Sequence, residues 1–372
     1  MKKVGIVTFH NTDNYGAELQ AYALQETVKS LGDKYDVKII DYRNSILEKN
    51  YKLFSIKGEN IRLKIRSLIG NIIYLKKNIC RRKSFRMYRK SNFYLTSKYK
   101  SDKKIKNEYP KFDIYITGSD QVWNHNIVGE LSDIYTLNFG DKNIRRISYA
   151  ASIGLNSISE EYKEIYFKKL QCLDSISVRE KKAKDILNQI VNKNIEVVLD
   201  PTLLLTKIEW NKKIENLEKK NKKEKYILAY VVAPDKEYTK IVNQLSKKTG
   251  LKIIHFGKKD IYKGIQESAY TEGPLEFINY IRNAEYVVAT SFHATVFSII
   301  FNKNFFIVPH KNTSSRVTNL LERLNLSDRI FYSNEEFEKF NINAEIDWNS
   351  VEKMLSIERT NSIDWLKNAL EG

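Results

Sequence analysis

The sequence has few of the residues on which metal sites and disulfide frameworks depend. Its 372 residues include only two cysteines and five histidines. Cys80 and Cys172 lie far apart, so we expect no zinc site and no redox pair, and we interpret both as free thiols in a reducing compartment. No apolar run reaches the roughly 18 residues that a membrane span needs. These absences predict a cytoplasmic protein with no metal in its site.

Motifs for nucleotides and nucleic acids are also missing. The chain has no G-x-G-x-x-G string after a strand and no P-loop. It has no zinc-finger spacing, no aromatic RNA-binding signature and no basic region linked to heptads, so no nucleic-acid partner is expected. The net charge of +18 nevertheless favours an anionic partner. A phosphorylated small molecule and an anionic membrane surface are the two candidates.

Short apolar runs typical of strands alternate with helical patterns along most of the chain. The runs are residues 4–9, 37–41, 112–117, 147–152, 175–178, 195–199, 226–232, 251–256, 286–289 and 305–308. Such alternation predicts parallel sheets covered by helices on both faces. We therefore expect an α/β fold with two Rossmann-like domains, and ligands at the carboxyl ends of the strands, in a cleft between the domains.

The predicted domain boundary lies in residues 206–225, which are rich in Lys, Asn and Glu. It separates an N-terminal domain, residues 1–206, from a C-terminal domain, residues 207–345. Residues 346–372 have helical spacing and are expected to pack back on the body. A basic insertion at about residues 55–106 mixes Ile and Leu with Lys and Arg. It is interpreted either as a helix packed on the core or as a helix on an anionic membrane surface.

Polar residues follow two predicted strands of the first domain. Asp13, Asn14 and Gly16 stand where a helix begins, and backbone N–H groups there can hold an anion or a sugar hydroxyl. Asp13 or Asn14 could equally cap that helix. After residues 112–117, Asp120 and Gln121 are expected at the carboxyl edge of the sheet, where a carboxylate can accept a proton from a sugar hydroxyl. The alternative there is a turn with a capping Asp.

Two arginines are placed where they could bind an anion. Arg179 ends a buried strand, and its paired donors suit a phosphate or a carboxylate. An ion pair with Glu180 or a neighbouring carboxylate is the alternative. Arg316 stands at the head of another predicted helix, where the alternative is a solvated surface charge.

His293 stands at the start of a predicted helix, directly after a buried strand and the hydroxyl residues Thr290 and Ser291. The helix dipole and the N–H groups of the first turn favour an anion beside it. A histidine in that position can donate to phosphate or move a proton, and the alternative is a structural histidine.

Five strings, taken together and in order, resemble the polysaccharide pyruvyl transferase family. They are DNYGAELQAY at 13–22, GSDQVW at 118–123, SVRE at 177–180, LDPT at 199–202 and SFH at 291–293. The resemblance covers roughly residues 3–325. It implies a GT-B-like arrangement with an interdomain cleft, and transfer of pyruvyl from phosphoenolpyruvate onto two sugar hydroxyls. The acceptor would belong to a cell-envelope glycan or an exopolysaccharide and would often be lipid-linked. No cofactor is implied beyond phosphoenolpyruvate as co-substrate.

The resemblance also assigns roles on the donor side. His293 matches the active-site histidine of the family, and we interpret it as a phosphate ligand and proton donor. Arg179 matches an arginine expected near the donor. Many members carry an Arg where this chain has Ser291, so another cation must serve the donor. Three basic residues are candidates to replace it: Arg316, Arg282 and Lys258.

On the acceptor side, Asp120 is the candidate base. Five further residues are expected to bind the acceptor: Asp13, Asn14, Gly16, Gln121 and Trp123. The Trp123 ring is a candidate to stack on a sugar, and the alternative is that it belongs to the core. The expected location is cytoplasmic, with peripheral contact at the inner face of the membrane.

Two other functions remain open from the sequence. The first is a GT-B glycosyltransferase with a nucleotide-sugar donor, although no acidic pair placed for a ribose follows His293. The second is a non-catalytic glycan-binding protein on the same fold, because a fold alone does not determine the reaction.

Overall fold

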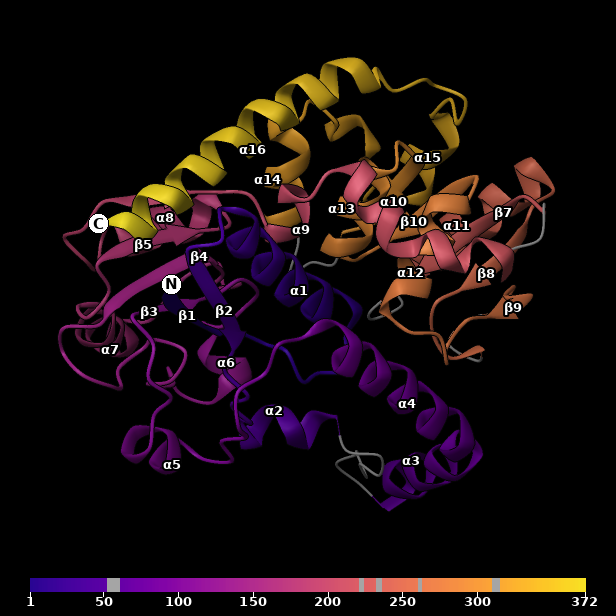
Figure 1. The fold of residues 1–372 in the computed structure, drawn as a ribbon. Helices are drawn as coiled ribbons and strands as arrows, with labels where there is room; N and C mark the ends of the chain where they lie inside the picture. The colour runs from indigo at the N-terminus through magenta and orange to yellow at the C-terminus, as the bar shows by residue number, and fades with distance from the viewer. Residues whose placement is uncertain (52–60, 221–223, 232–235, 260–262, 310–314) are drawn as a thin grey trace. The chain divides into compact units, whose positions relative to one another are not determined.

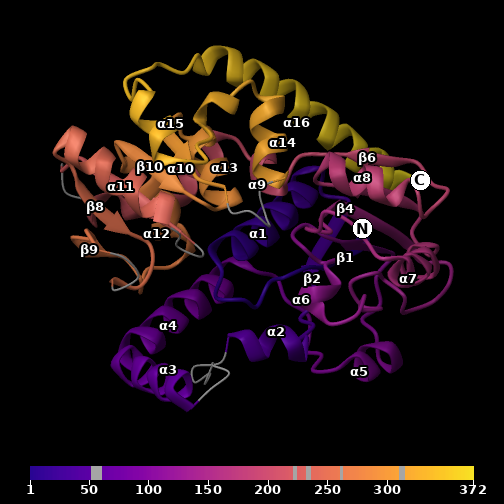
Figure 2. The ribbon, with the colours of Figure 1, turned by 180° about the vertical axis from the view of Figure 1, so that it is seen from behind.

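The computed structural model describes residues 1–372 except 52–60, 221–223, 232–235, 260–262 and 310–314. The described residues form two compact units, residues 1–204 with 359–372 and residues 205–358. Each unit contains its own parallel sheet with helices packed around it (Figure 1, Figure 2). The predicted α/β class with parallel sheets is confirmed.

The first unit is built on a six-stranded parallel sheet with the order β2-β1-β3-β4-β5-β6. Its strands are β1 Lys2–Val7, β2 Tyr35–Ile39, β3 Ile114–Thr117, β4 Arg145–Ala151, β5 Ser175–Val178 and β6 Ile195–Val197. The central strands are buried on both faces, and all four residues of β3 are inaccessible to solvent. Continuous apolar runs such as IYIT are typical of strands covered on both sides.

Helices of the first unit cover this sheet and extend beyond it. They are α1 Tyr15–Ser30, α2 Ser45–Asn50, α3 Ile61–Ile73, α4 Leu75–Asn92, α5 Asp102–Asn107, α6 His125–Val128, α7 Glu160–Leu170, α8 Lys181–Leu187 and α9 Pro201–Leu204. The basic insertion predicted at residues 55–106 contains α3, α4 and most of α5, while its residues 55–60 lie outside the described residues. α4 is anchored by buried Phe85 and Tyr88, whereas the apolar side chains along α3 whose burial is described are exposed.

The second unit has a five-stranded parallel sheet with the order β11-β10-β7-β8-β9. Its strands are β7 Tyr226–Tyr230, β8 Lys252–His255, β9 Glu267–Ser268, β10 Tyr286–Ala289 and β11 Asn304–Ile307. Its helices are α10 Lys207–Ile214, α11 Lys236–Thr249, α12 Pro274–Asn283, α13 Phe292–Ile300, α14 Ser315–Arg323 and α15 Asn334–Lys339, with short 3₁₀ turns η1 Glu215–Lys220 and η3 Ser327–Arg329. The two-residue strand β9 had no counterpart among the predicted strands.

The last helix, α16 (Trp348–Glu371), is continuous through the change of unit at residues 358 and 359. Its second half packs on the first unit. There Arg359 Nε donates to the Leu203 carbonyl at 2.9 Å, and the Leu199 N–H donates to Ser362 Oγ at 3.0 Å.

Each sheet has one point at which the chain reverses its direction of winding. In the first sheet the chain runs from β1 outward to β2 and then returns to β3 on the other side of β1. In the second sheet it runs from β7 through β8 to β9 and returns to β10 on the other side of β7. Loops diverge at the carboxyl ends of the strands that flank such a point, and α/β proteins bind ligands there.

Candidate functional site

The loops after β1 and β3 meet at the reversal point of the first sheet. The Ser119 N–H donates to Gln20 Oε1 at 3.1 Å, and Gln20 Nε2 donates to Thr8 Oγ1 at 2.8 Å. Thr8 Oγ1 in turn donates to the Ser119 carbonyl at 3.4 Å. Gln20 belongs to the string 13–22 and Ser119 to the string 118–123, so the hydrogen bonds join these two motifs directly.

Asp13 and Asn14 both stabilise the start of α1. Asn14 is the N-cap, and its side-chain oxygen accepts from the Ala17 N–H at 3.2 Å. Asp13 forms ion pairs with Arg89 at 3.4 Å and with Arg82 at 3.5 Å. Asn14 therefore caps α1, as the alternative interpretation predicted. Asp13 instead connects the start of α1 to α4 through its ion pairs.

Arg179 lies inside a cluster of carboxylates. Its Nη1 donates to Asp200 Oδ2 at 2.8 Å, and Asp120 and Glu180 lie 3.7 and 3.8 Å from its other nitrogens. Burial pulls the pKa of the Arg179 guanidinium down, but the three carboxylates outweigh burial and hold it above its ordinary value. An incoming phosphate would be repelled by these carboxylates. The ion-pair alternative therefore describes the observed contacts of Arg179, and its contact with the donor stays a prediction.

Asp120 is the carboxylate of this cluster with access to solvent. Its side chain is 14% exposed, whereas that of Asp200 is 0% exposed. The Asp120 carboxylate accepts from the Gln121 N–H at 2.9 Å. Gln121 is held in turn, because its Oε1 accepts from Asn124 Nδ2 at 2.9 Å. The Asp120 side chain is thus held by a backbone hydrogen bond and is partly exposed to solvent.

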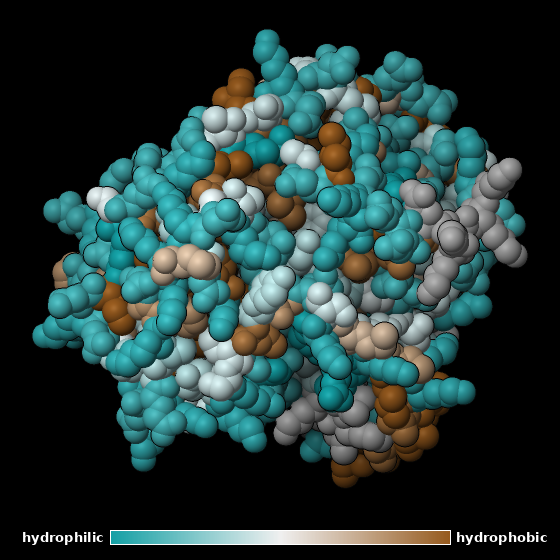
Figure 3. Space-filling view, in the orientation of Figure 1, coloured by the Kyte–Doolittle hydropathy of each residue, from teal (hydrophilic) through white to brown (hydrophobic). Residues whose placement is uncertain are grey.

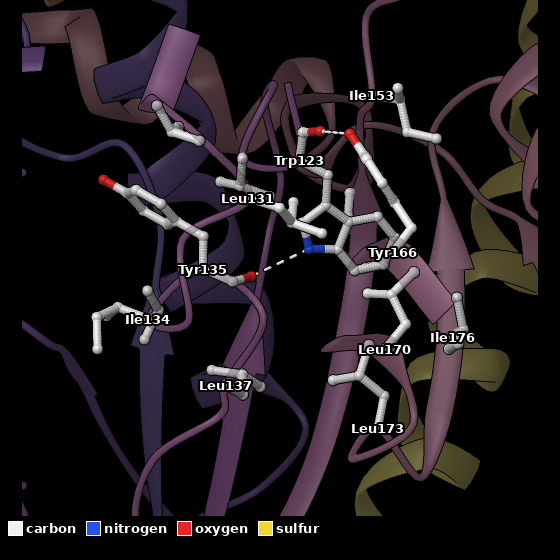
Figure 4. Close-up of a cluster of buried hydrophobic side chains, with 14 of the residues drawn as sticks. Trp123, Leu131, Ile134, Tyr135, Leu137, Ile153, Tyr166, Leu170, Leu173 and Ile176 are labelled. Atoms are coloured by element: carbon white, nitrogen blue, oxygen red, sulfur yellow. Dashed lines mark hydrogen bonds between the residues drawn. The ribbon is translucent and has the colours of Figure 1, made fainter. Parts of the chain in front are cut away.

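Trp123 belongs to the hydrophobic core of the first unit, which corrects the prediction that it stacks on a sugar. Its ring is fully buried, and Nε1 donates to the Tyr135 carbonyl at 3.0 Å. Figure 4 shows the ring packed among Leu131, Leu170 and neighbouring apolar side chains, with the Tyr166 hydroxyl bonded to the Trp123 carbonyl. No face of the indole is left for a ligand, so we remove Trp123 from the candidate site.

Gly118 allows the sharp exit from β3 that places Asp120, and its replacement should destabilise the first unit. Its φ is +114°, and a Cβ there would lie 2.1 Å from the Tyr149 carbonyl oxygen. We expect Gly118→Ala to cost more than about 1 kcal/mol of unfolding free energy, because both the backbone conformation and the contact oppose a side chain. Hydrogen exchange of peptides from β3 and β4 measures this.

The matched control is Gly70→Ala on α3. Among the described residues, no atom outside the neighbouring backbone of α3 lies within 4 Å of a Cβ at Gly70. Alanine there should be neutral or stabilising, because glycine is the poorer helix former. Equal protection of β3 and β4 in the two variants would contradict the role given to Gly118.

In the second unit, His293 is buried in the first turn of α13, directly after β10 at the reversal point of that sheet. Ser291 is the N-cap, and its side chain makes no capping hydrogen bond. Its carbonyl accepts from Thr295 Oγ1 at 3.0 Å, while the Thr290 N–H donates to the Tyr230 carbonyl at 3.1 Å. The first N–H groups of an α-helix have no intrahelical acceptor and attract anions.

The strand order of the second sheet distinguishes the three basic residues proposed to replace the family arginine at the position of Ser291. Arg282 lies in the last turn of α12, which leads into the amino end of β10, so it lies at the edge of the sheet opposite His293. Its guanidinium donates to Asn279 and Asn211. Lys258 follows the carboxyl end of β8, two strands away from β10, and Arg316 lies in the first turn of α14 after the adjacent strand β11. Of the three, only Arg316 follows a strand that neighbours β10.

Three residues that stabilise the loops of the first-unit site were not among the residues predicted from the sequence. Asp200, in the string 199–202, accepts from Ser119 Oγ at 3.1 Å and so ties the loop after β3 to α9.

Glu18 is fully buried on α1 and accepts from Arg89 Nη1 at 2.7 Å and from the Thr12 N–H at 3.2 Å. Burial raises the pKa of Glu18 to about 8 against the pull of Arg89. The signal for Asp200 and Glu18 was their place within recognised strings; Arg89 had none.

The described residues contain neither a cluster that could hold a metal ion nor a helix that could span a membrane. Outside the five gaps in the description, there is no group of three or more His, Cys, Asp or Glu residues placed to hold a metal ion. Among the described helices, none combines the length and the apolarity that crossing a membrane requires.

Comparison with a known family gives one match. The sequence profile described as polysaccharide pyruvyl transferase matches residues 14–312, which is most of the chain. That range contains most of the five strings and all of the site residues named above except Asp13 and Arg316. A comparison with curated proteins gives no match.

Comparison with solved structures establishes the fold. The UDP-GlcNAc 2-epimerase from Neisseria meningitidis bound to UDP-GlcNAc aligns with a TM-score of 0.50 and 10% identity, over 100% of this chain and 99% of that chain. The UDP-GlcNAc 2-epimerase from Methanocaldococcus jannaschii gives a TM-score of 0.50 and 14% identity, over 96% and 99%. Both are GT-B proteins, so the predicted GT-B-like fold with two Rossmann-like domains is confirmed. At these identities the likeness concerns the fold alone.

Proposed function

The chain belongs to the polysaccharide pyruvyl transferase family, and we propose that it moves a pyruvyl group from phosphoenolpyruvate onto two hydroxyls of a sugar in a cell-envelope glycan or exopolysaccharide. The observation that carries this proposal is the place of the family strings in the fold. Strings 13–22 and 118–123 follow the two strands that flank the reversal point of the first sheet, and string 291–293 follows β10 at that of the second. These are the positions at which α/β sheets bind ligands.

For the donor, we assign the phosphate of phosphoenolpyruvate to the start of α13. His293 supplies a ring N–H and the first turn supplies backbone N–H groups, while Thr290 and Ser291 add hydroxyls. Arg316 supplies the positive charge that many family members have at the position of Ser291. A dense anion is favoured there because the helix dipole and the basic side chain act in the same direction.

The proposed reaction conserves atoms and needs no oxidant or reductant. The methylene carbon of phosphoenolpyruvate gains a proton, for which His293 is the proposed donor. The neighbouring carbon then forms bonds to two sugar oxygens, while its bond to the phosphate ester oxygen breaks. The two hydroxyl protons balance the one added to carbon and the one taken up by the leaving phosphate. Because the step is redox-neutral, we propose phosphoenolpyruvate as co-substrate and no further cofactor.

For the acceptor, we propose that the first unit binds the sugar. Asp120 is the candidate general base, because it is the solvent-accessible carboxylate of the Arg179 cluster. The Gln121 side chain and the loop of Asp13, Asn14 and Gly16 complete the proposed acceptor surface. The buried pair of Arg179 and Asp200 is joined to the loop after β3, which carries Asp120, because Ser119 Oγ donates to Asp200.

Donor binding tests the proposal against the two other functions. Thermal unfolding is measured with phosphoenolpyruvate and, separately, with UDP-GlcNAc. A rise in melting temperature with phosphoenolpyruvate alone supports the proposed donor. A rise with UDP-GlcNAc alone indicates a nucleotide-sugar enzyme, and no rise with either ligand favours a protein that binds glycans without catalysis.

We further propose that α3 places the protein at the inner face of an anionic membrane, where a lipid-linked acceptor would be found. Apolar side chains recur along α3 at helical spacing and are exposed: Ile61, Ile65, Leu68, Ile69, Ile72 and Ile73. They form the brown area over α3 at the lower edge of Figure 3. The exposed basic residues beside them are Arg62, Lys64, Lys76 and Lys77. An apolar face bordered by positive charge is typical of helices that lie on anionic bilayers.

Vesicle co-sedimentation tests this placement. We expect the protein to sediment with phosphatidylglycerol vesicles at low salt and less at high salt, because each basic residue near the surface is worth about 1 kcal/mol. Replacing Ile65, Ile69 and Ile72 together with glutamine should abolish sedimentation. Ile208→Gln, at an apolar residue on α10 that is 79% exposed, is the control and should bind as the unmodified protein does. Absence of binding at both salt concentrations, or equal binding to neutral vesicles, would refute the membrane role of α3.

A further inference from the structure

A basic pocket in the first unit shares Asp13 with the proposed acceptor loop, while its basic residues have no role in the function proposed above. Its volume is about 740 Å³. Eleven residues line it: Asn11, Asp13, Arg43, Glu48, Tyr51, Arg82, Arg86, Arg89, Lys90, Leu95 and Lys98. Six of them are Arg or Lys and two are acidic. The pocket is therefore strongly cationic.

The pocket lies where an α/β sheet binds ligands. Asn11 and Asp13 follow the carboxyl end of β1, and Arg43 follows the carboxyl end of the neighbouring strand β2. α4 contributes four of the basic residues at helical spacing, Arg82, Arg86, Arg89 and Lys90. Residues three, four, seven or eight apart lie on the same face of a helix, so α4 presents one cationic face to the pocket.

Three of the basic side chains are held in place by carboxylates. Arg89 donates to the buried carboxylate of Glu18 at 2.7 Å. Arg82 pairs with Asp13 at 3.5 Å, and Arg43 pairs with Asp41. These contacts fix the walls of the pocket and neutralise part of its charge.

The other three basic side chains have no such counter-charge. Arg86, Lys90 and Lys98 are exposed, and none forms an ion pair with any residue in the described part of the chain. The positive charge of the pocket exceeds the negative charge even when the carboxylates of Glu18 and Asp41, behind its walls, are counted. A ligand that supplies several negative charges would balance this excess, and arginine donors suit the oxygens of a phosphate.

We propose that this pocket binds the phosphate or diphosphate through which the acceptor sugar is carried. The inference rests on the proposed function, which gives the protein a sugar acceptor and places its binding loop at Asp13. Since Asp13 lines the pocket and belongs to that loop, a phosphate bound in the pocket would lie beside the proposed acceptor loop. The volume exceeds that of a single phosphate and leaves room for a sugar diphosphate.

Calorimetry with inorganic pyrophosphate tests the pocket. The variant is Arg86→Gln with Lys90→Gln, two exposed positions where the fold should tolerate glutamine. We expect its affinity for pyrophosphate to fall at least about tenfold, since hydrogen bonds between charged groups contribute that factor or more. The control, Lys83→Gln with Lys103→Gln, removes the same charge from exposed positions outside the pocket and should bind as the unmodified protein does. Absence of pyrophosphate binding to the unmodified protein, or equal losses in both variants, would overturn the proposal.

Two further measurements separate this inference from its alternatives. Sedimentation with phosphatidylglycerol vesicles distinguishes a soluble phosphate ligand from a lipid headgroup. If Arg86→Gln with Lys90→Gln weakens only vesicle binding, these residues serve the membrane surface and the pocket proposal is wrong. Phosphoenolpyruvate binding, measured on the same variant, should be unchanged, because the donor is assigned to the second unit. Failure of phosphoenolpyruvate to bind any form would refute the proposed function, whatever the result with pyrophosphate.

Discussion

Replacement of His293 by alanine is expected to lower turnover of phosphoenolpyruvate by about 10²–10⁴-fold, the range that a positioned proton donor contributes. The imidazole is buried at the first turn of α13, where it is assigned both to the donor phosphate and to proton transfer. Phosphate release in the presence of a glycan acceptor measures turnover, and calorimetry measures donor affinity. The fold should be retained, because the rest of α13 keeps its buried apolar residues.

Two further variants make the His293 result specific. His293→Gln keeps an N–H donor but has no titratable proton, so it should retain more donor affinity than alanine while losing as much turnover. His125→Ala is the control, because His125 stacks on Tyr162 in the first unit and takes no part in the proposed chemistry. Near-normal turnover of His293→Ala, or an equal loss in His125→Ala, would show that the donor site lies elsewhere.

Replacement of Asp200 by alanine is expected to lower the unfolding free energy of the first unit by about 3–5 kcal/mol, the cost of removing one partner from a buried ion pair. Asp200 is inaccessible to solvent and accepts from Arg179 at 2.8 Å, from Ser119 Oγ at 3.1 Å and from the Thr202 N–H at 3.0 Å. Its loss leaves the Arg179 guanidinium buried without its closest counter-ion. Hydrogen exchange of peptides from β3, β5 and α9 reports on this unit alone.

The control for Asp200 is an exposed ion pair of the same unit. Glu164 and Lys168 face solvent on α7, and Glu164→Gln should leave the exchange rates almost unchanged, because exposed pairs contribute little. Similar protection in Asp200→Ala and Glu164→Gln would contradict the assignment of Arg179 to a buried ion-pair cluster.

The positions of the strands and of the residues that follow them were largely predictable from the sequence, because strand and helix patterns alternate clearly. The runs at 112–117 and 286–289 became β3 and β10 within two residues. In a parallel sheet the residue after each strand must lie at the carboxyl edge, so the placement of Asp120 and His293 followed from the pattern alone.

Which partner each side chain meets was not predictable, because that depends on residues far away in the sequence. Arg179 looked like an anion ligand, yet Asp200 pairs with it from the end of another strand. Trp123 stands two residues beyond Gln121, but packing with Leu131 and Leu170 makes it core. The pocket could not be foreseen either, since it requires α4 to lie beside the loop after β1, and local sequence does not specify that contact.

The most direct test of pyruvyl transfer is the mass of a glycan acceptor after incubation with the protein and phosphoenolpyruvate. We predict that the acceptor gains the mass of pyruvic acid less one water, with one inorganic phosphate released per acceptor modified, and that His293→Ala forms both products about 10²–10⁴-fold more slowly. Modification of the acceptor by a hexosamine from UDP-GlcNAc, with no phosphate released from phosphoenolpyruvate, would contradict it.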